Sequence, residues 1–231
     1  LNKSKSLELQ KSLLLNNMTK KIITPVLSIC FLFVATILVA DNHWQFENNK
    51  HYRTLSIAEN LSIAEEKIEV LEIFAYSCNH CFNFETYLDK FEKSKADYID
   101  FKKMPVVFND NYKMHARIYY TAESLGNLDI MHREIFKAMH LDRKSLMDEN
   151  EIYEVFAKQG ITKQQFLSRF RSFTVESKVN RAQRLTSKYR IRSTPTMVIN
   201  GKYTANGPAT KTFEDMLAVS KELAEREFLS R

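Results

Sequence analysis

Residues 68–81 read Ile68-Glu69-Val70-Leu71-Glu72-Ile73-Phe74-Ala75-Tyr76-Ser77-Cys78-Asn79-His80-Cys81. The first nine of them form a short, mostly apolar run, which is typical of a buried strand. An amphipathic stretch follows, in which Phe84, Leu88 and Phe91 recur at helical spacing. The sequence therefore predicts that two cysteines lie where a strand hands over to a helix.

That junction favours a thiolate. The first N–H groups of a helix have no partner within the helix, and the helix dipole is positive there, so negative charge on Cys78 is stabilised and its pKa falls. Cys78 is at the exposed end and Cys81 lies one turn deeper, so we expect Cys78 to attack and Cys81 to resolve the mixed disulfide. His80 either places an N–H or a positive charge near Cys78 or is a solvated surface residue. These features indicate thiol–disulfide redox chemistry.

Cysteine spacing argues against a structural role. Apart from Cys30, which lies in an apolar run, the chain holds only Cys78 and Cys81. A disulfide that closes so short a loop adds little stability, and a structural zinc site needs four ligands, for which no second pair appears. We predict no metal and no other cofactor, because the redox group is the Cys78–Cys81 disulfide itself. The remaining histidines show no ligand spacing and are expected at the surface or core edge: His43, His51, His115, His132 and His140.

The first forty residues predict an export signal. Lys20-Lys21 precedes the apolar run Ile22–Ala40, and the small Ala40 suits cleavage. The run is close in length to a bilayer span, so an uncleaved membrane anchor is the alternative. The signal starts at Leu1 or at Met18. We expect a periplasmic protein.

Charge gives little reason to expect nucleic-acid binding. Five of the 34 Lys and Arg and one of the 28 Asp and Glu precede residue 41, so the rest of the chain carries 29 basic against 27 acidic residues. The net charge thus falls from +6 to about +2 without the leader. The basic character belongs largely to the leader, and no nucleic-acid partner is predicted.

The order of the remaining patterns predicts an α/β protein. The expected elements are a short edge strand at 52–55, strands at 68–76 and 98–107, helical periodicity between about 112 and 190 with a capping box at Thr162 and Gln165, a strand at 196–199 with a hairpin turn at Asn200-Gly201, and a closing amphipathic helix. We expect a thioredoxin-like fold, residues 41–110 and 189–231, with an inserted all-helical domain at 111–188. The first two long strands should pair in parallel across their helix.

Particular residues then point to a family. They are Val70-Leu71-Glu72-Ile73-Phe74, the Cys78-x-His80-Cys81 motif, Phe84-Glu85, and Arg192-Ser193-Thr194-Pro195-Thr196-Met197-Val198-Ile199-Asn200-Gly201-Lys202-Tyr203. Together they resemble the DsbA family over nearly all of residues 50–230. One position departs from the family pattern, which has Pro-His between the cysteines: Asn79 restores a backbone N–H but loosens the turn. These two effects act in opposite directions, so the sequence alone does not determine whether Asn79 raises or lowers the redox potential.

The resemblance implies further site residues. Thr194 and Pro195 would end a loop in a cis-proline beside the disulfide, where backbone groups pair with an extended substrate. Glu72, Glu85 and Lys103 would form a charged cluster beneath the disulfide that helps to carry the proton of the second cysteine. From the residues alone, Glu72 is either a buried acid that needs a partner or an edge-facing one, and Glu85 could simply be solvated.

The function that follows is an exported oxidoreductase. We expect a monomer that donates the Cys78–Cys81 disulfide to reduced, unfolded secreted proteins and is reoxidised by a quinone-linked, DsbB-like membrane partner. A reductase or isomerase with the same site is one alternative. A protein that binds a soft metal such as copper through the cysteine pair is another.

Overall fold

The structure is a computed structural model that describes residues 44–56 and 66–231. The expected signal or anchor at 1–40 lies outside the described residues. The chain divides into two compact units, residues 1–44 and 45–231, and every element below belongs to the second. Within the described residues, none of the helices has the length and apolar character that crossing a membrane requires.

The fold is built on a five-stranded sheet with the strand order β1-β5-β4-β2-β3. The strands are β1 (Arg53–Thr54), β2 (Ile68–Phe74), β3 (Ile99–Pro105), β4 (Thr196–Ile199) and β5 (Tyr203–Thr204). β2 and β3 are parallel and are joined through α2 (Asn79–Ser94), as the sequence predicts, while β4 runs antiparallel to β2. Every residue of β2 is buried, Glu69 and Glu72 included, which explains why the strand is mostly apolar and does not alternate with polar residues.

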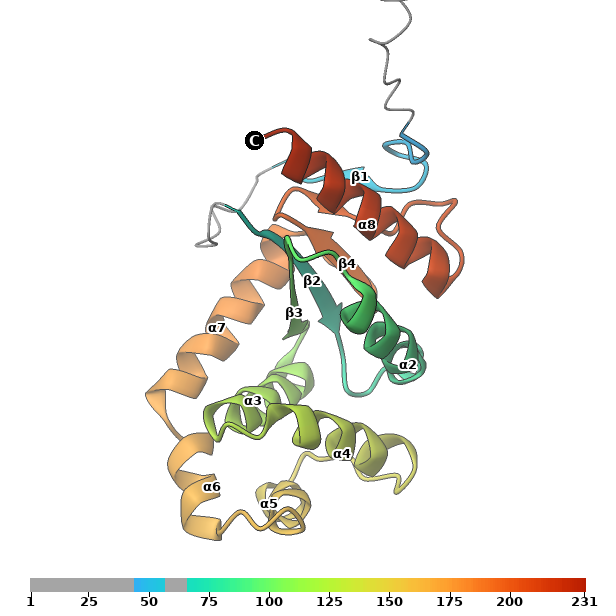
Figure 1. The fold of residues 1–231 in the computed structure, drawn as a ribbon. Helices are drawn as coiled ribbons and strands as arrows, with labels where there is room; N and C mark the ends of the chain where they lie inside the picture. Colours follow the sequence, from blue (N-terminus) through green and yellow to red (C-terminus); the bar gives the residue numbers. More distant parts are fainter. Residues whose placement is uncertain (1–43, 57–65) are drawn as a thin grey trace, which may run out of the picture. The chain divides into compact units, whose positions relative to one another are not determined.

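Helices fill the chain between β3 and β4. They are α3 (Asp110–Ser124), α4 (Leu128–His140), α5 (Glu149–Ala157), α6 (Lys163–Phe170) and α7 (Phe173–Lys188), and α8 (Phe213–Leu229) closes the chain (Figure 1). Thr162 and Gln165 form the expected capping box at the start of α6. The thioredoxin-like α/β class is confirmed, whereas the division into 41–110, 111–188 and 189–231 stays a prediction.

Backbone geometry accounts for two sharp connections. Asn200 and Gly201 have φ of 49° and 62° and join β4 to β5, which is the hairpin turn that the sequence predicts. Gly207 is needed for a different reason, because a Cβ there would lie 2.4 Å from the carbonyl carbon of His51. The Gly207 N–H donates to the His51 carbonyl at 2.9 Å, so the two backbones touch.

The sheet separates two hydrophobic cores. Successive side chains of β2 point to opposite faces of the sheet, so they pack in different cores. Ile68 and Val70 pack with buried residues of α2 and α8. Leu71 and Ile73 face the other way and pack with buried residues of α3 and α7. Glu72 continues the row of Ile68 and Val70, so its carboxyl lies on the side of α2.

Candidate active site

Cys78 is the N-cap residue of α2. Its backbone is extended, with φ −91° and ψ 113°, and α2 begins at the next residue. The Cys78 sulfur accepts a hydrogen bond from the backbone N–H of Cys81 at 3.3 Å. The sulfur thus replaces the side-chain oxygen that usually satisfies the orphan donors at a helix start. Both cysteines are free thiols in this structure.

These contacts stabilise the thiolate form of Cys78. Hydrogen bonds from the side chain of Cys81, from the side chain of Thr194 and from the backbone N–H groups of Cys81 and His80 lower the pKa of Cys78 to about 5, although partial burial acts in the opposite direction. Cys78 remains half-buried, so the sulfur is within reach of another protein's thiol. A low pKa and partial exposure are the two properties of a reactive cysteine.

Cys81 has the opposite character. It is fully buried among apolar side chains. Burial, followed by the hydrogen bond to Cys78 and the charge of Glu72, raises the pKa of the Cys81 thiol well above its usual range. The two sulfurs are therefore chemically unequal, and Cys81 holds its proton at neutral pH.

The loop before β4 supplies the other side of the site. The Thr194–Pro195 peptide bond is cis. The Cys78 thiol donates to the Thr194 carbonyl oxygen at 3.3 Å. Thr194 is half-buried and Pro195 is buried. A segment more than a hundred residues away in the chain is thereby placed against the first cysteine.

The two residues between the cysteines lie at the surface. Asn79 and His80 are both exposed. The contribution of His80 to the Cys78 pKa comes from its backbone N–H. The sequence left open whether the His80 imidazole lies near Cys78 or in solvent, and in the structure it lies on the solvent side of the helix start.

Glu72, Glu85 and Lys103 come together on the α2 side of the sheet. Glu72 and Lys103 are register partners on β2 and β3, with the Lys103 Nζ 4.0 Å from a Glu72 Oε. Lys103 also donates to both carboxyl oxygens of Glu85, at 2.6 and 2.8 Å. The next lysine along β3, Lys102, faces the opposite side and pairs there with Glu69. Strand alternation thus selects Lys103 over its neighbour.

The two acids of this cluster differ in protonation. Glu72 is fully buried, and among the described residues neither of its carboxyl oxygens has a hydrogen-bond partner. Burial raises the pKa of Glu72, and the nearby Lys103 charge offsets only part of the effect. Burial also raises the pKa of Glu85, but hydrogen bonds from His132 and Lys103 and the charge of Lys103 outweigh it and hold that pKa below its usual range. Glu85 is therefore an anion at neutral pH, and Glu72 tends to keep its proton.

His132 is a member of this cluster that sequence reasoning missed. Its expected place at the surface or core edge is wrong, because His132 is 5% exposed and its Nε2 lies 3.2 Å from Glu85 and 3.3 Å from Lys103. Its Nδ1 lies 2.9 Å from the Tyr76 hydroxyl. Burial lowers the pKa of His132, so the ring is neutral at neutral pH. A signal was available: His132 falls on the apolar stripe of α4.

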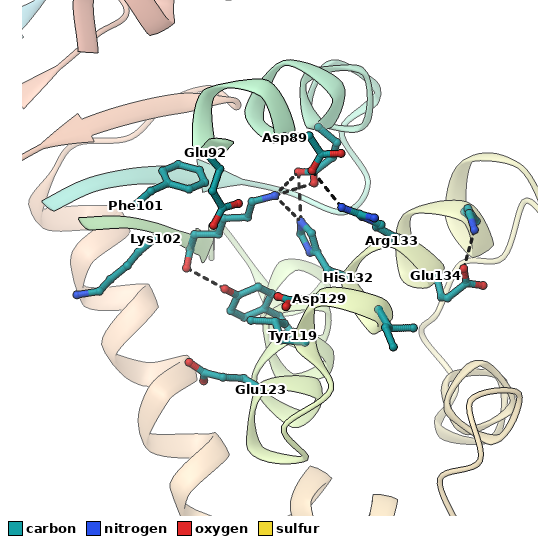
Figure 2. A pocket seen from close by; sticks show the side chains of 15 residues that line it. Asp89, Glu92, Phe101, Lys102, Tyr119, Glu123, Asp129, His132, Arg133 and Glu134 are labelled. Carbon is teal, nitrogen blue, oxygen red and sulfur yellow. Dashed lines mark hydrogen bonds and ion pairs between the residues drawn. The ribbon is translucent and has the colours of Figure 1, made fainter. Parts of the chain in front are cut away.

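A surface cavity of about 740 Å³ lies against the same cluster, between α2, β3, α3 and α4. Figure 2 shows His132 at its wall, with Arg133 on the neighbouring position of α4 bonded to Asp89. Glu85 and Lys103 also line the cavity, so the cluster borders solvent there. Within residues 44–56 and 66–231, no group of three or more His, Cys, Asp or Glu is arranged to hold a metal ion.

A cysteine pair at a helix start, facing a cis-proline loop on a thioredoxin-like sheet, defines a disulfide oxidoreductase. A model of the DSBA-like thioredoxin domain matches residues 108–218. The thiol:disulfide interchange protein DsbA of Pseudomonas aeruginosa is 33% identical over 216 residues, which cover 91% of this chain and 97% of the relative. The chain belongs to the DsbA family.

Other relatives agree with this assignment. DsbA of Burkholderia cepacia is 33% identical over 162 residues, or 70% of this chain and 76% of the relative. The crystal structure of Pseudomonas aeruginosa DsbA superposes with a TM-score of 0.75 at 30% identity, over 80% of this chain and 96% of that one. Xylella fastidiosa DsbA superposes with a TM-score of 0.73 at 29% identity, over 79% and 97%.

Proposed function

We propose that this oxidoreductase works in the periplasm as an oxidase, which donates the Cys78–Cys81 disulfide to reduced, newly exported proteins. The observation that carries the proposal is the helix-capping position of Cys78, which lowers its pKa to about 5. Stabilising the thiolate stabilises the reduced form of the pair, and a pair with a stable reduced form is a strong oxidant. Family membership supports the direction of the chemistry.

The first step is an attack on the Cys78 sulfur. A substrate thiolate approaches the half-exposed Cys78, forms a bond to its sulfur and breaks the bond to Cys81. The electron pair of the broken bond stays on Cys81. The raised pKa of Cys81 draws a proton to that sulfur. The carboxyl of Glu72 is our candidate donor, because its own raised pKa lets it hold a proton and because, once ionised, its charge acts on Cys81.

The second step releases the product. A second substrate thiolate attacks the substrate sulfur of the mixed disulfide, and Cys78 leaves as a thiolate. Its low pKa makes Cys78 a good leaving group. In total the substrate has lost two electrons and two protons. The pair has gained both electrons, Cys81 has gained one proton, and the other proton goes to solvent because Cys78 stays a thiolate. Lys103 and Glu85 connect Glu72 to the cavity side, where the proton balance is restored with solvent.

The loop before β4 holds the substrate in this proposal. Thr194 and Pro195 lie beside Cys78 and offer backbone groups to an extended chain, which allows many sequences to be accepted. A quinone-linked membrane protein reoxidises the pair. No resident cofactor is needed, because the disulfide itself carries the two electrons.

The test is stoichiometric oxidation of a reduced, unfolded test protein by the oxidised protein. We expect two test-protein thiols to disappear for each Cys78–Cys81 disulfide, measured by thiol titration of the test protein after it is separated from the oxidised protein. Cys78→Ala should abolish the reaction, whereas the control Thr162→Ala, which removes only the cap of α6, should retain it. If the pair instead stays mostly oxidised in equilibrium with glutathione, its reduction potential is low, as in a cytosolic reductant. That result would favour the reductase alternative. Copper binding without thiol oxidation would favour the metal-binding alternative.

A further inference from the structure

One face of α4 contacts a single tyrosine at three points. His132, Phe136 and His140 follow one another at intervals of four residues and so share a helix face. The ring of Phe136 packs edge-on against Tyr76 with a centroid distance of 5.0 Å. His132 Nδ1 lies 2.9 Å from the Tyr76 hydroxyl, and His140 Nε2 lies 2.8 Å from the Tyr76 carbonyl oxygen.

Tyr76 belongs to the turn that presents the reactive cysteine. It is fully buried and lies two residues before Cys78. The Cys78 N–H donates to the Ala75 carbonyl at 3.0 Å, which closes the turn around Tyr76. Because both residues belong to this turn, any movement of the Tyr76 backbone also moves the Cys78 backbone.

His140 contacts both sides of Cys78. A carbonyl oxygen only accepts, so His140 Nε2 carries the hydrogen and donates to Tyr76. The imidazole also stacks on Phe82, with a centroid distance of 4.8 Å and an interplanar angle of 5°. The Phe82 N–H in turn donates to the Cys78 carbonyl at 3.1 Å. The His140 side chain thus contacts Tyr76, two residues before Cys78, and Phe82, four residues after it.

One tautomer of His132 satisfies both Tyr76 and Glu85. If the Tyr76 hydroxyl donates to Nδ1, then Nε2 carries the hydrogen and donates to Glu85 Oε1, and each of these groups is satisfied. In the other tautomer Nδ1–H points at the tyrosine oxygen, and the hydroxyl hydrogen needs an acceptor elsewhere in a buried setting. The first arrangement links Tyr76 to the Glu85–Lys103 pair.

We propose that His132 and His140 are positioning residues for the redox site, which anchor the hydroxyl and the carbonyl of Tyr76 to α4 and thereby aim the Cys78 sulfur at the Cys81 N–H and at Thr194. This inference rests on the proposed role of Cys78 as the attacked sulfur. Neither histidine touches the reacting atoms. Both act through Tyr76 and the turn.

The consequence is an effect on thiolate stability. The hydrogen bond from the Cys81 N–H to the Cys78 sulfur is 3.3 Å long, and hydrogen bonds weaken steeply when their geometry degrades. Releasing either anchor lets the turn fluctuate and loosens this bond. The Cys78 thiolate then loses stabilisation, and the disulfide becomes a weaker oxidant.

Four variants separate the anchors from general packing. His140→Phe keeps a ring against Phe82 but cannot donate to Tyr76, and His140→Gln restores a donor without the ring. Tyr76→Phe keeps the packing against α4 and removes only the hydroxyl. The control is His115→Phe on α3, because His115 is also buried and also donates from Nε2 to a backbone carbonyl, that of Ser145, at 3.1 Å.

Two quantities are measured on each reduced, folded protein: the Cys78 pKa, from thiolate absorbance, and the equilibrium with glutathione. We expect His140→Phe to raise the Cys78 pKa by about half a unit or more, which is about threefold in the thiolate-to-thiol ratio, with a matching change in the equilibrium. Tyr76→Phe should act in the same direction, His140→Gln should recover part of the wild-type value, and His115→Phe should change neither quantity even if it lowers the melting temperature.

The inference fails if folded Tyr76→Phe and His140→Phe both keep the wild-type pKa and equilibrium, or if His115→Phe shifts them equally. Should His140→Phe not fold, Tyr76→Phe alone decides. The oxidase proposal fails on a separate result, namely a wild-type glutathione equilibrium typical of a reductant. The variant series remains readable in that case, because the Cys78 pKa requires no oxidase activity.

Discussion

Reduced protein should gain stability with rising pH because of one sulfur. The perturbation is Cys78→Ser, which removes the titrating thiol while keeping a capping side chain of similar size. Cys78 has a pKa of about 5 in the folded protein, whereas an unfolded cysteine titrates near about 8.5. A group whose folded pKa is depressed stabilises the fold above its unfolded pKa, and this stability is lost as the pH falls through the folded pKa.

The magnitude follows from that difference. A shift of roughly 3.5 units at about 1.4 kcal/mol per unit gives a ceiling of about 5 kcal/mol. Cys78 is only half-buried, and solvent screening reduces the effect, so we expect about 2–3 kcal/mol. The gain should accumulate between about pH 5 and pH 8.5 and level off on either side.

The assay is urea unfolding of the two reduced proteins in a phosphine reductant at pH values from 5 to 9. The difference in unfolding free energy between wild type and Cys78→Ser removes the contribution of all other titrating groups. Wild type should gain about 2–3 kcal/mol over the variant across this range. Parallel pH profiles for the two proteins would refute the reasoning.

Three further substitutions have defined outcomes in urea unfolding. Lys103→Met removes the cation that pairs with Glu85 and Glu72 and should lower the free energy of unfolding by about 2–3 kcal/mol at pH 7. This loss should shrink as the pH falls from about 4 towards 2, where Glu85 protonates. A loss that does not depend on pH would contradict the ion pair. Gly207→Ala places a Cβ 2.4 Å from backbone and should cost about 1–3 kcal/mol; an unchanged midpoint would refute the close approach. Thr162→Ala should cost about 1 kcal/mol through the lost cap of α6 and leave the glutathione equilibrium unchanged.

Local patterns made most of the fold predictable. The strand, the cysteine pair and the following helix are adjacent in sequence, so local patterns are enough to indicate the junction at Cys78. The strand predicted at 98–107 is shorter in the structure, at 99–105, and Asn109 a few residues later is the N-cap of α3. The capping box at Thr162 and the turn at Asn200-Gly201 are likewise determined by neighbouring residues.

The site beneath the cysteines was harder to predict because it is built by docking. The choice of Lys103 over Lys102 follows from parallel register and strand alternation, once β2 and β3 are known to pair at Glu72 and Lys103. The position of Thr194 beside Cys78 came from family resemblance, since no local pattern links residues so far apart. His132 was missed because its partners depend on how α4 packs against the end of β2, which periodicity in one helix does not reveal.

The Cys78 pKa itself is the quantity on which the proposed chemistry depends. Absorbance of the thiolate at about 240 nm, followed through a pH titration of the reduced wild-type protein, reports it without any substrate. The account predicts one transition near pH 5 and no second thiolate in the neutral range, because burial holds Cys81 protonated. A first transition near about pH 8.5, the value of an ordinary cysteine, would show that the helix start does not stabilise this sulfur and would remove the basis for an oxidising disulfide.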